Sequence, residues 1–260
     1  MRAGGRMRIA DAIRHRYRVG APAAMQLVLG SWFDTPAGRA VLEAERAACR
    51  RLPGAPGFRL VHLGIAPGKG VATSFPQTCR FSLAAASGEE VAAVVAFDAL
   101  PLPSDTVDVV VLHHVLDFAR LPHAVLAEAA RTLRPGGRLV LVGFDPYSPF
   151  GIAKWLLSPL CAHSVWRHNS LRRSRLVDWL ALLGFAVDNP VREARNAWRM
   201  PFEDAWRMLF DSRGVRSYVI TATKRAVPLQ PLYQRPRMRG AALLGAGAGR
   251  ARIAANSGER

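Results

Sequence analysis

Two adjacent histidines, His113 and His114, have the side chains best suited to moving a proton. They follow an apolar run over residues 109–112, and imidazole titrates near neutral pH, so either ring could act as a general base. Successive residues of a strand point to opposite sides, which predicts that at most one ring faces a ligand. Structural or solvated histidines are the alternative. The pattern predicts no metal site, because His-His-x-x-Asp differs from HExxH and no third ligand follows at a recognisable spacing.

A glycine-containing turn, Gly64-Ile65-Ala66-Pro67-Gly68, follows a second apolar stretch that contains His62. Glycine at such a turn lets the backbone approach a ligand closely, although an ordinary tight turn would use the same residues. Asp98 follows a third apolar stretch and could accept a hydrogen bond from a ligand. Its alternative role is that of a solvated turn residue before Pro101.

These residues need a scaffold, and the chain alternates short apolar runs with helical patterns. Thr35 can cap a helix that begins at Pro36 and ends before Pro53. The alternation predicts a parallel α/β sheet, whose strand ends would bring the histidines, the glycine turn and Asp98 to one edge. The expected strands are 59–63, 80–85, 91–97, 107–112, 138–144, 185–191 and 218–223, and the later helices are 121–133, 171–183 and 196–210.

Four stretches occur in the order of known motifs: LVHLGIAPG at 60–68, DALPL at 98–102, HHVLDF at 113–118 and RTLRPGGRL at 131–139. A later Leu183-Gly184-Phe185 fits the same series. Together they resemble class I S-adenosylmethionine-dependent methyltransferases of the small-molecule, type 11-like group, over about half of the chain. The resemblance implies a Rossmann-like seven-stranded sheet with helices on both faces, and S-adenosylmethionine (SAM) as the cofactor.

The resemblance also implies roles for individual residues. His113 and His114 would be catalytic, since they follow the fourth strand beside the methyl-donor site. Asp98 would accept a hydrogen bond from the adenine amino group. The full set of cofactor-binding positions is His62, Gly64, Ala66, Gly68, Asp98, Leu112 and His113.

Three positions depart from the family pattern. His62 stands where the family has an acid, and Ala66 replaces the middle glycine of the loop. The second strand ends without the acid that grips the ribose and offers only Ser82, because Glu89 and Glu90 come too late. Each charge-assisted hydrogen bond contributes roughly 1.5–3 kcal/mol, so these losses predict a lower cofactor affinity.

The acceptor side is expected after the fifth strand, where residues 146–160 are predicted to form a cap. Arg167, Arg172, Arg173 and Arg175 lie nearby in the sequence and could dock an anionic acceptor, although a solvated helix face would look the same. The sequence therefore predicts a small or anionic acceptor.

The composition limits the other possibilities. The 260 residues are 50% hydrophobic, which excludes a disordered chain, and no apolar run approaches the ~20 residues that span a bilayer. The three cysteines form no CxxC pair, which favours a cytoplasmic protein. The net charge of +17 lies mostly at the ends: residues 1–20 hold six Arg and Asp11, and residues 224–260 hold eight basic residues and Glu259.

These observations predict three parts: a basic flexible arm at 1–20, a methyltransferase-like domain at 21–225 and a basic disordered tail at 226–260. The leading hypothesis is a SAM-dependent methyltransferase. The alternative is a non-catalytic member of the same fold that acts as a binding module. Its basic ends could then hold nucleic acid through charge alone.

Overall fold

A computed structural model describes residues 21–54, 57–66, 68–148, 169, 171–194 and 216–226, with only the backbone for 189–194. Its centre is a seven-stranded sheet in the order β3-β2-β1-β4-β5-β7-β6, which confirms the predicted fold class. The strands are β1 (Arg59–Gly64), β2 (Cys79–Ala84), β3 (Ala93–Val94), β4 (Val107–His113), β5 (Leu133–Phe144), β6 (Phe185–Ala194) and β7 (Ser217–Lys224).

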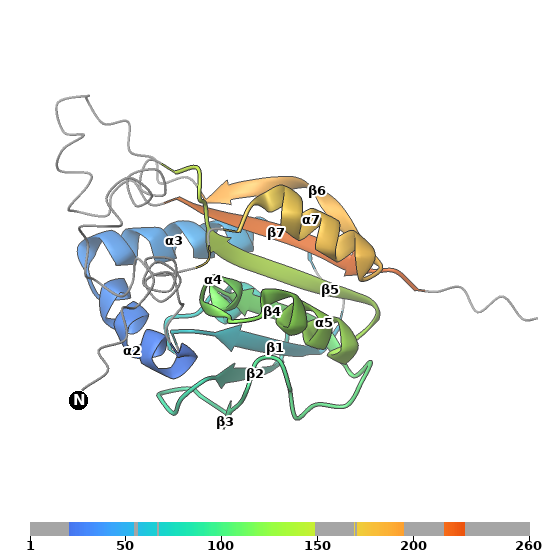
Figure 1. The fold of residues 1–260 in the computed structure, drawn as a ribbon, viewed down its shortest axis with the longest axis horizontal. Coiled ribbons are helices and arrows are strands. Elements are labelled where there is room, and N and C mark those ends of the chain that lie inside the picture. The colour runs from blue at the N-terminus through green and yellow to red at the C-terminus, as the bar shows by residue number, and fades with distance from the viewer. Residues whose placement is uncertain are drawn as a thin grey trace, which may run out of the picture. The chain divides into compact units, whose positions relative to one another are not determined.

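The direction of one strand differs from the prediction. Strand β7 is antiparallel to both of its neighbours, β5 and β6, so the sheet is mixed. Figure 1 shows the arrow of β7 pointing away from α2, opposite to the arrows of β1 and β2. Alternating apolar runs reveal that strands exist but do not encode their direction, and therefore the sequence pattern missed this reversal.

The third strand is also shorter than predicted. Residues 91–97 were expected to pair throughout, yet only Ala93 and Val94 pair with β2. This is the edge of the sheet, where Val94 is exposed and the chain turns back through a bridge between Ala96 and Ala99. Short edge strands leave few unpaired backbone groups open to aggregation. Asp98 consequently lies in a turn and not at the end of a long strand.

The predicted helices among the described residues are present: α3 (Pro36–Arg50), α5 (Pro122–Thr132) and α7 (Arg173–Leu182). Thr35 caps α3 by accepting a hydrogen bond from the backbone N–H of Gly38 at 3.1 Å. The sequence pattern missed α2 (Pro22–Phe33), the single-turn α4 (Val115–Phe118) and the short η1 (Ala72–Ser74). Helix α2 is apolar on most of its surface, so it lacks the periodicity that marks an amphipathic helix.

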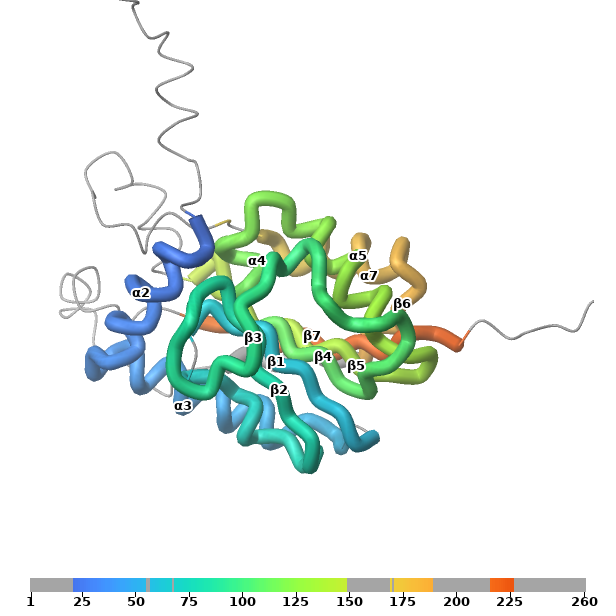
Figure 2. Tube along the Cα trace, turned by 90° about the horizontal axis from the view of Figure 1, so that it is seen from below, coloured from blue at the N-terminus to red at the C-terminus, as the bar shows by residue number. Residues whose placement is uncertain are grey.

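The helices cover both faces of the sheet. Figure 2 shows α3 on one face and α4, α5 and α7 on the other. Helix α3 contacts β6 and β7, while α5 packs on β5 and α7 on β6. Strand β4 is buried along its whole length, as expected for a central parallel strand. The predicted arm 1–20, the predicted helix 196–210 and residues 227–260 of the predicted tail lie outside the described residues.

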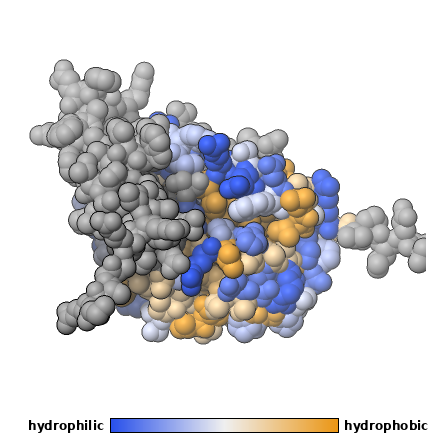
Figure 3. Space-filling view, in the orientation of Figure 1, coloured by the Kyte–Doolittle hydropathy of each residue, from blue (hydrophilic) through white to orange (hydrophobic). Residues whose placement is uncertain are grey.

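Among the described residues, no helix combines the length and apolarity needed to cross a bilayer. The face seen in Figure 3 mixes hydrophilic and hydrophobic residues. Cys49 and Cys79 are both free thiols.

Asp108 fixes the start of the central strands. Its carboxylate accepts hydrogen bonds from the backbone N–H groups of Phe58 at 2.8 Å and Arg59 at 2.7 Å, and Arg134 pairs with it at 2.6 Å. Burial alone would raise the pKa of Asp108, but the two N–H groups and the charge of Arg134 outweigh it and lower the pKa. The ionised form is therefore the one that stabilises the fold.

We expect Asp108→Asn to lower the free energy of unfolding at neutral pH by roughly 1.5–3 kcal/mol. Because the folded-state pKa is lowered, the stabilisation is complete above the unfolded value of about 4 and is lost as the pH falls through the folded value. Urea unfolding at a series of pH values should show the gap between wild type and variant closing in acid. Asp178→Asn, at an exposed position of α7, is the control. A gap that stays constant with pH would contradict the role given to the Asp108 carboxylate.

Candidate functional site

The ends of β1 and β4 meet where the resemblance places the cofactor. Gly64 and His113 are register partners at the carboxyl ends of these two strands. Strands β2 and β3 extend the sheet beyond β1, while β5 extends it beyond β4, so the loops after β1 and β4 leave in opposite directions. Such a switch point forms the crevice in which open α/β sheets bind their ligands.

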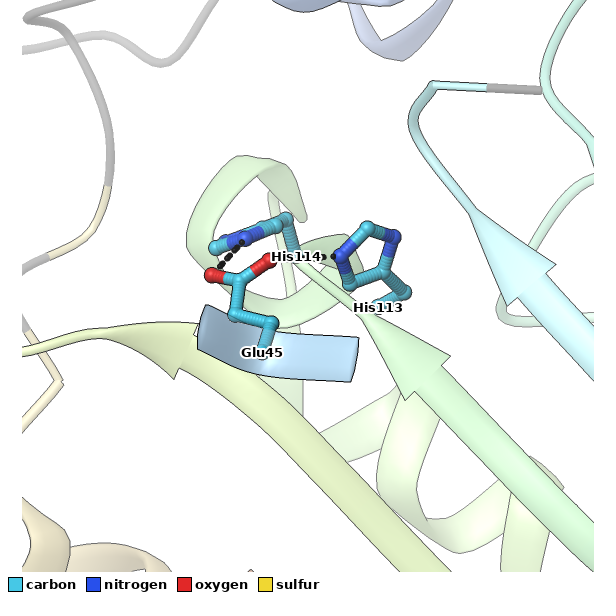
Figure 4. Close-up of side chains that lie close together, drawn as sticks. All are labelled: Glu45, His113 and His114. Atoms are coloured by element: carbon cyan, nitrogen blue, oxygen red, sulfur yellow. Dashed lines mark hydrogen bonds and ion pairs between the residues drawn. The ribbon is translucent and has the colours of Figure 1, made fainter. Parts of the chain in front are cut away.

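Strand geometry predicted that the two histidines point to opposite sides, but in the structure they do not. His113 is the last residue of β4, and His114 has a left-handed backbone with a φ of 57°. The strand alternation ends at this turn, so both rings reach the same carboxylate, that of Glu45 on α3 (Figure 4). A non-glycine residue in this conformation is uncommon, and it is often found at functional sites.

Glu45 joins the two rings in a network that we call the Glu45 cluster, formed by Glu45, His113, His114, Asp117 and Ser217. His113 Nε2 lies 3.1 Å from Glu45 Oε2, and His114 Nε2 lies 3.0 Å from Glu45 Oε1. His114 Nδ1 lies 2.9 Å from Asp117 Oδ2, and the Ser217 hydroxyl donates to Glu45 Oε1. The side chains of Glu45, His113, His114 and Asp117 are 0% exposed, so the cluster is sealed from solvent.

Electrostatics distinguishes the two rings of this network. Burial would raise the pKa of Glu45, but the charge of His114 and the hydrogen bonds from both histidines hold it far below its ordinary value. Burial lowers the pKa of His114, yet Glu45 and Asp117 outweigh it and raise the pKa to about 9. For His113, burial dominates and lowers the pKa. His114 is therefore cationic between two carboxylates, and His113 is neutral.

This difference bears on the predicted catalytic roles. Both nitrogens of His114 face carboxylates, so its ring has no nitrogen available to take a proton in this arrangement. Nδ1 of His113 has no hydrogen-bond partner among the described residues. The base role therefore stays a prediction that fits His113 better than His114.

His62 fills the inside of the glycine turn. Its ring lies 5.7 Å from that of His113 between centroids, and its Nε2 is buried without a hydrogen-bond partner among the described residues. Burial, with a smaller contribution from His113, lowers the pKa of His62 to about 3, so the ring is neutral. A neutral imidazole thus occupies the position at which the family has a negative charge.

The turn itself is held by α2. Gly68 has a φ of 70°, which favours glycine, and Ala66 is buried, while Pro67 lies outside the described residues. The Lys69 ammonium pairs with Asp34 and donates to the carbonyl of Gly30 at 3.0 Å. Helix α2 therefore lies against the turn that is predicted to hold the cofactor.

A second contact of α2 orders the segment after β2. The Gln26 amide donates to the carbonyl of Ala86 at 3.0 Å and accepts from its backbone N–H at 2.9 Å. This segment brings Glu89 beside the turn, because a Cβ added to Gly68 would lie 4.0 Å from the Cβ of Glu89. From its distance along the sequence, Glu89 was expected to lie too far from the end of the second strand to bind the ribose.

The remaining predicted residues do not belong to the Glu45 cluster. Asp98 is exposed in its turn, and Leu112 is buried within β4. On the acceptor side, Arg173 pairs with Asp145 at 2.7 Å, and Arg172 lies 6.0 Å from the centre of the Tyr147 ring. Most of the predicted cap 146–160, together with Arg167, lies outside the described residues.

Sequence reasoning did not select Glu45 or Gln26. The sequence does contain a signal for Glu45, because this acid occupies the apolar face of α3 formed by Val41, Leu42, Ala48 and Cys49. A charged residue in such a position must find partners in the core. Glu45 is also the third possible metal ligand, whose donor atom lies within 4.8 Å of those of His113 and His114.

Comparison with known proteins finds a matching domain family and proteins of similar fold. The methyltransferase domain family matches residues 74–141, from η1 into β5. YafS of Escherichia coli (strain K12), an uncharacterized protein, is 33% identical over 145 residues. That match covers 54% of this chain and 60% of YafS, so it spans less than two thirds of the relative.

Two solved structures share the architecture. A chain from the complex of the Haloferax volcanii Trm112 methyltransferase activator with its candidate methyltransferase has a TM-score of 0.57 at 16% identity, covering 78% of this chain and 98% of that one. A SAM-dependent methyltransferase of Thermotoga maritima has a TM-score of 0.55 at 18% identity, covering 75% and 93%. Identities this low show the fold alone. The shared architecture thus shows that the described part of this chain has the class I methyltransferase fold, within which residues 74–141 match the methyltransferase domain family.

Proposed function

We propose that this domain binds SAM at the carboxyl edge of β1 and β4 and transfers its methyl group to a small or anionic acceptor. The observation that carries the proposal is the pairing of Gly64 with His113 at the switch point of the sheet. This pairing brings the glycine turn and the end of β4 together at the crevice. Such a site aligns donor and acceptor, and that alignment supplies much of the catalysis of a transfer reaction.

On this proposal the turn at Gly64, Ala66 and Gly68 holds the methionine end of the donor, with His62 beneath it. Asp98 accepts a hydrogen bond from the adenine amino group. Glu89 accepts hydrogen bonds from the ribose hydroxyls, because it lies beside Gly68 and the end of the second strand lacks an acid. Leu112 and His113 line the methyl-donor side. The two free cysteines of the described residues fit a reducing compartment such as the cytoplasm.

One observation favours the alternative of a non-catalytic binding module. The neutral ring of His62 packs against Gly64 and Gly70 in place of the family's acid, which removes a negative charge from the donor site. Donor binding decides between the two functions, and calorimetric titration with S-adenosylhomocysteine measures it directly. Micromolar binding by the full chain supports the methyltransferase, whereas no heat at millimolar ligand, with a folded protein, supports the binding module.

The same titration tests the residue assignments. We expect Asp98→Ala and Glu89→Ala each to raise the dissociation constant about tenfold, which corresponds to a loss of about 1.4 kcal/mol. Glu90→Ala, at the exposed neighbouring position, is the matched control and should leave the constant unchanged. If Glu90→Ala has the larger effect, the ribose has been assigned to the wrong acid.

A further inference from the structure

The Glu45 cluster contains a set of metal-ligand donors that the chemistry of methyl transfer does not require. His113 Nε2, His114 Nε2 and the Glu45 carboxylate each offer a donor atom, and these atoms lie within 4.8 Å of one another. The two imidazole–carboxylate pairs are 3.1 and 3.0 Å apart. Two donors bound to one tetrahedral zinc ion at ~2.0–2.1 Å lie roughly 3.3 Å apart, which is close to the spacing of both imidazole–carboxylate pairs. The other donor spacings, which lie within 4.8 Å, would close further around the ion.

Two of these donor residues, His114 and Glu45, have the supporting partners of a metal site. A metal-ligating histidine usually donates its other ring N–H to a carboxylate or a carbonyl, which fixes the ring. His114 faces Asp117 in this way through Nδ1 at 2.9 Å, and the Ser217 hydroxyl supports Glu45. Phe33 stacks on His113 at 5.9 Å and Phe144 on His114 at 4.0 Å, which gives the donors an apolar surround.

The formal charges agree as well. Glu45 and Asp117 bring two carboxylates into a region that is 0% exposed. A divalent cation carries the charge that balances these two carboxylates while both imidazoles stay neutral. Buried charges that are not balanced are costly, so a doubly charged occupant is compatible with the two carboxylates of the cluster.

We propose that Glu45, His113 and His114 bind a divalent first-row transition-metal ion, for which Zn²⁺ is the reference ion. Two imidazoles and one carboxylate suit zinc and its neighbours, whereas Mg²⁺ and Ca²⁺ prefer oxygen ligands. Binding releases one proton from the His114 imidazolium to the buffer, while neutral His113 moves its ring proton from Nε2 to Nδ1 so that Nε2 can coordinate the ion. The two histidines then act as ligands and not as bases.

The test uses the full chain, treated with a chelator, dialysed and titrated with Zn²⁺ against a chromophoric competitor. We expect one tightly bound Zn²⁺ per chain, with no comparable binding of Mg²⁺, and visible absorption bands of low-coordinate Co²⁺ when cobalt is substituted. Glu45→Gln and His113→Gln should each weaken Zn²⁺ binding more than about 100-fold, and Asp117→Asn by about 10–100-fold.

Two matched controls separate this site from adventitious binding. Glu43 lies on the same helix with its side chain 63% exposed, and His123 is exposed on α5, so Glu43→Gln and His123→Gln should bind Zn²⁺ like the wild type. Circular dichroism verifies that each variant is folded, and Asp117→Asn keeps all three ligands if a ligand variant fails to fold. The proposal is overturned if the wild-type chain takes up no Zn²⁺ in preference to Mg²⁺, or if the controls lose as much affinity as Glu45→Gln. Since the readout is metal content and not S-adenosylhomocysteine binding, its failure is distinct from failure of the proposed function.

Discussion

Replacing Glu45 by alanine is expected to lower the free energy of unfolding by about 3–5 kcal/mol, because it removes one partner of a buried ionic network. In the wild type, Glu45 accepts from His113, His114 and Ser217, all of them inside the core. The variant leaves these donors without their common acceptor. Urea unfolding in a buffer that contains a chelator measures the effect of the hydrogen bonds without that of a bound ion.

Glu43→Ala is the control for this measurement, since it removes the same carboxylate two residues earlier on α3. Its side chain is 63% exposed and pairs with Arg46, so we expect a change within about 0.5 kcal/mol. A loss below about 1 kcal/mol for Glu45→Ala would mean that Glu45 does not hold the two rings in the folded protein. The comparison also shows how strongly the contribution of a carboxylate on α3 to the free energy of unfolding depends on whether that carboxylate is buried or exposed.

Gly70→Ala is expected to lower stability by about 1–3 kcal/mol and to weaken S-adenosylhomocysteine binding, because it overpacks the inside of the glycine turn. A Cβ at position 70 would lie 2.4 Å from Cε1 and 2.7 Å from Nε2 of His62. His62 is buried and cannot swing into solvent, so either the ring or the turn must shift. Urea unfolding and calorimetric titration of the same preparations measure the two effects.

A double-mutant cycle isolates the contact with His62. In a His62→Ala background the added methyl group has room, so Gly70→Ala should cost less there, with a coupling energy of about 0.5–3 kcal/mol. Gly30→Ala is the control, because nothing lies within 4 Å of an added Cβ and alanine favours the helix α2. Equal costs of Gly70→Ala in both backgrounds would show that His62 does not fill the turn.

The resemblance and the periodicity of the sequence together predicted most of the scaffold. The run 107–112 is apolar except near its start, and it forms the buried strand β4. Thr35 and Pro36 predicted the start of α3, because capping is a local property of neighbouring residues. Four motifs in order predicted the class I methyltransferase fold, and the order of the strands in the sheet confirms it.

The arrangement of the site depended on the tertiary structure. Strand alternation predicted that His113 and His114 would diverge, but the left-handed backbone at His114 turns both rings to Glu45, which lies 68 residues before His113. Likewise, Glu89 was judged too distant along the chain, yet the segment held by Gln26 brings it beside Gly68. By itself, then, the sequence determined most of the elements, because caps and periodicity act over a few residues. Which charged groups share a buried space was decided by the packing of α2 and α3 on the strand ends, a long-range property that local patterns do not contain.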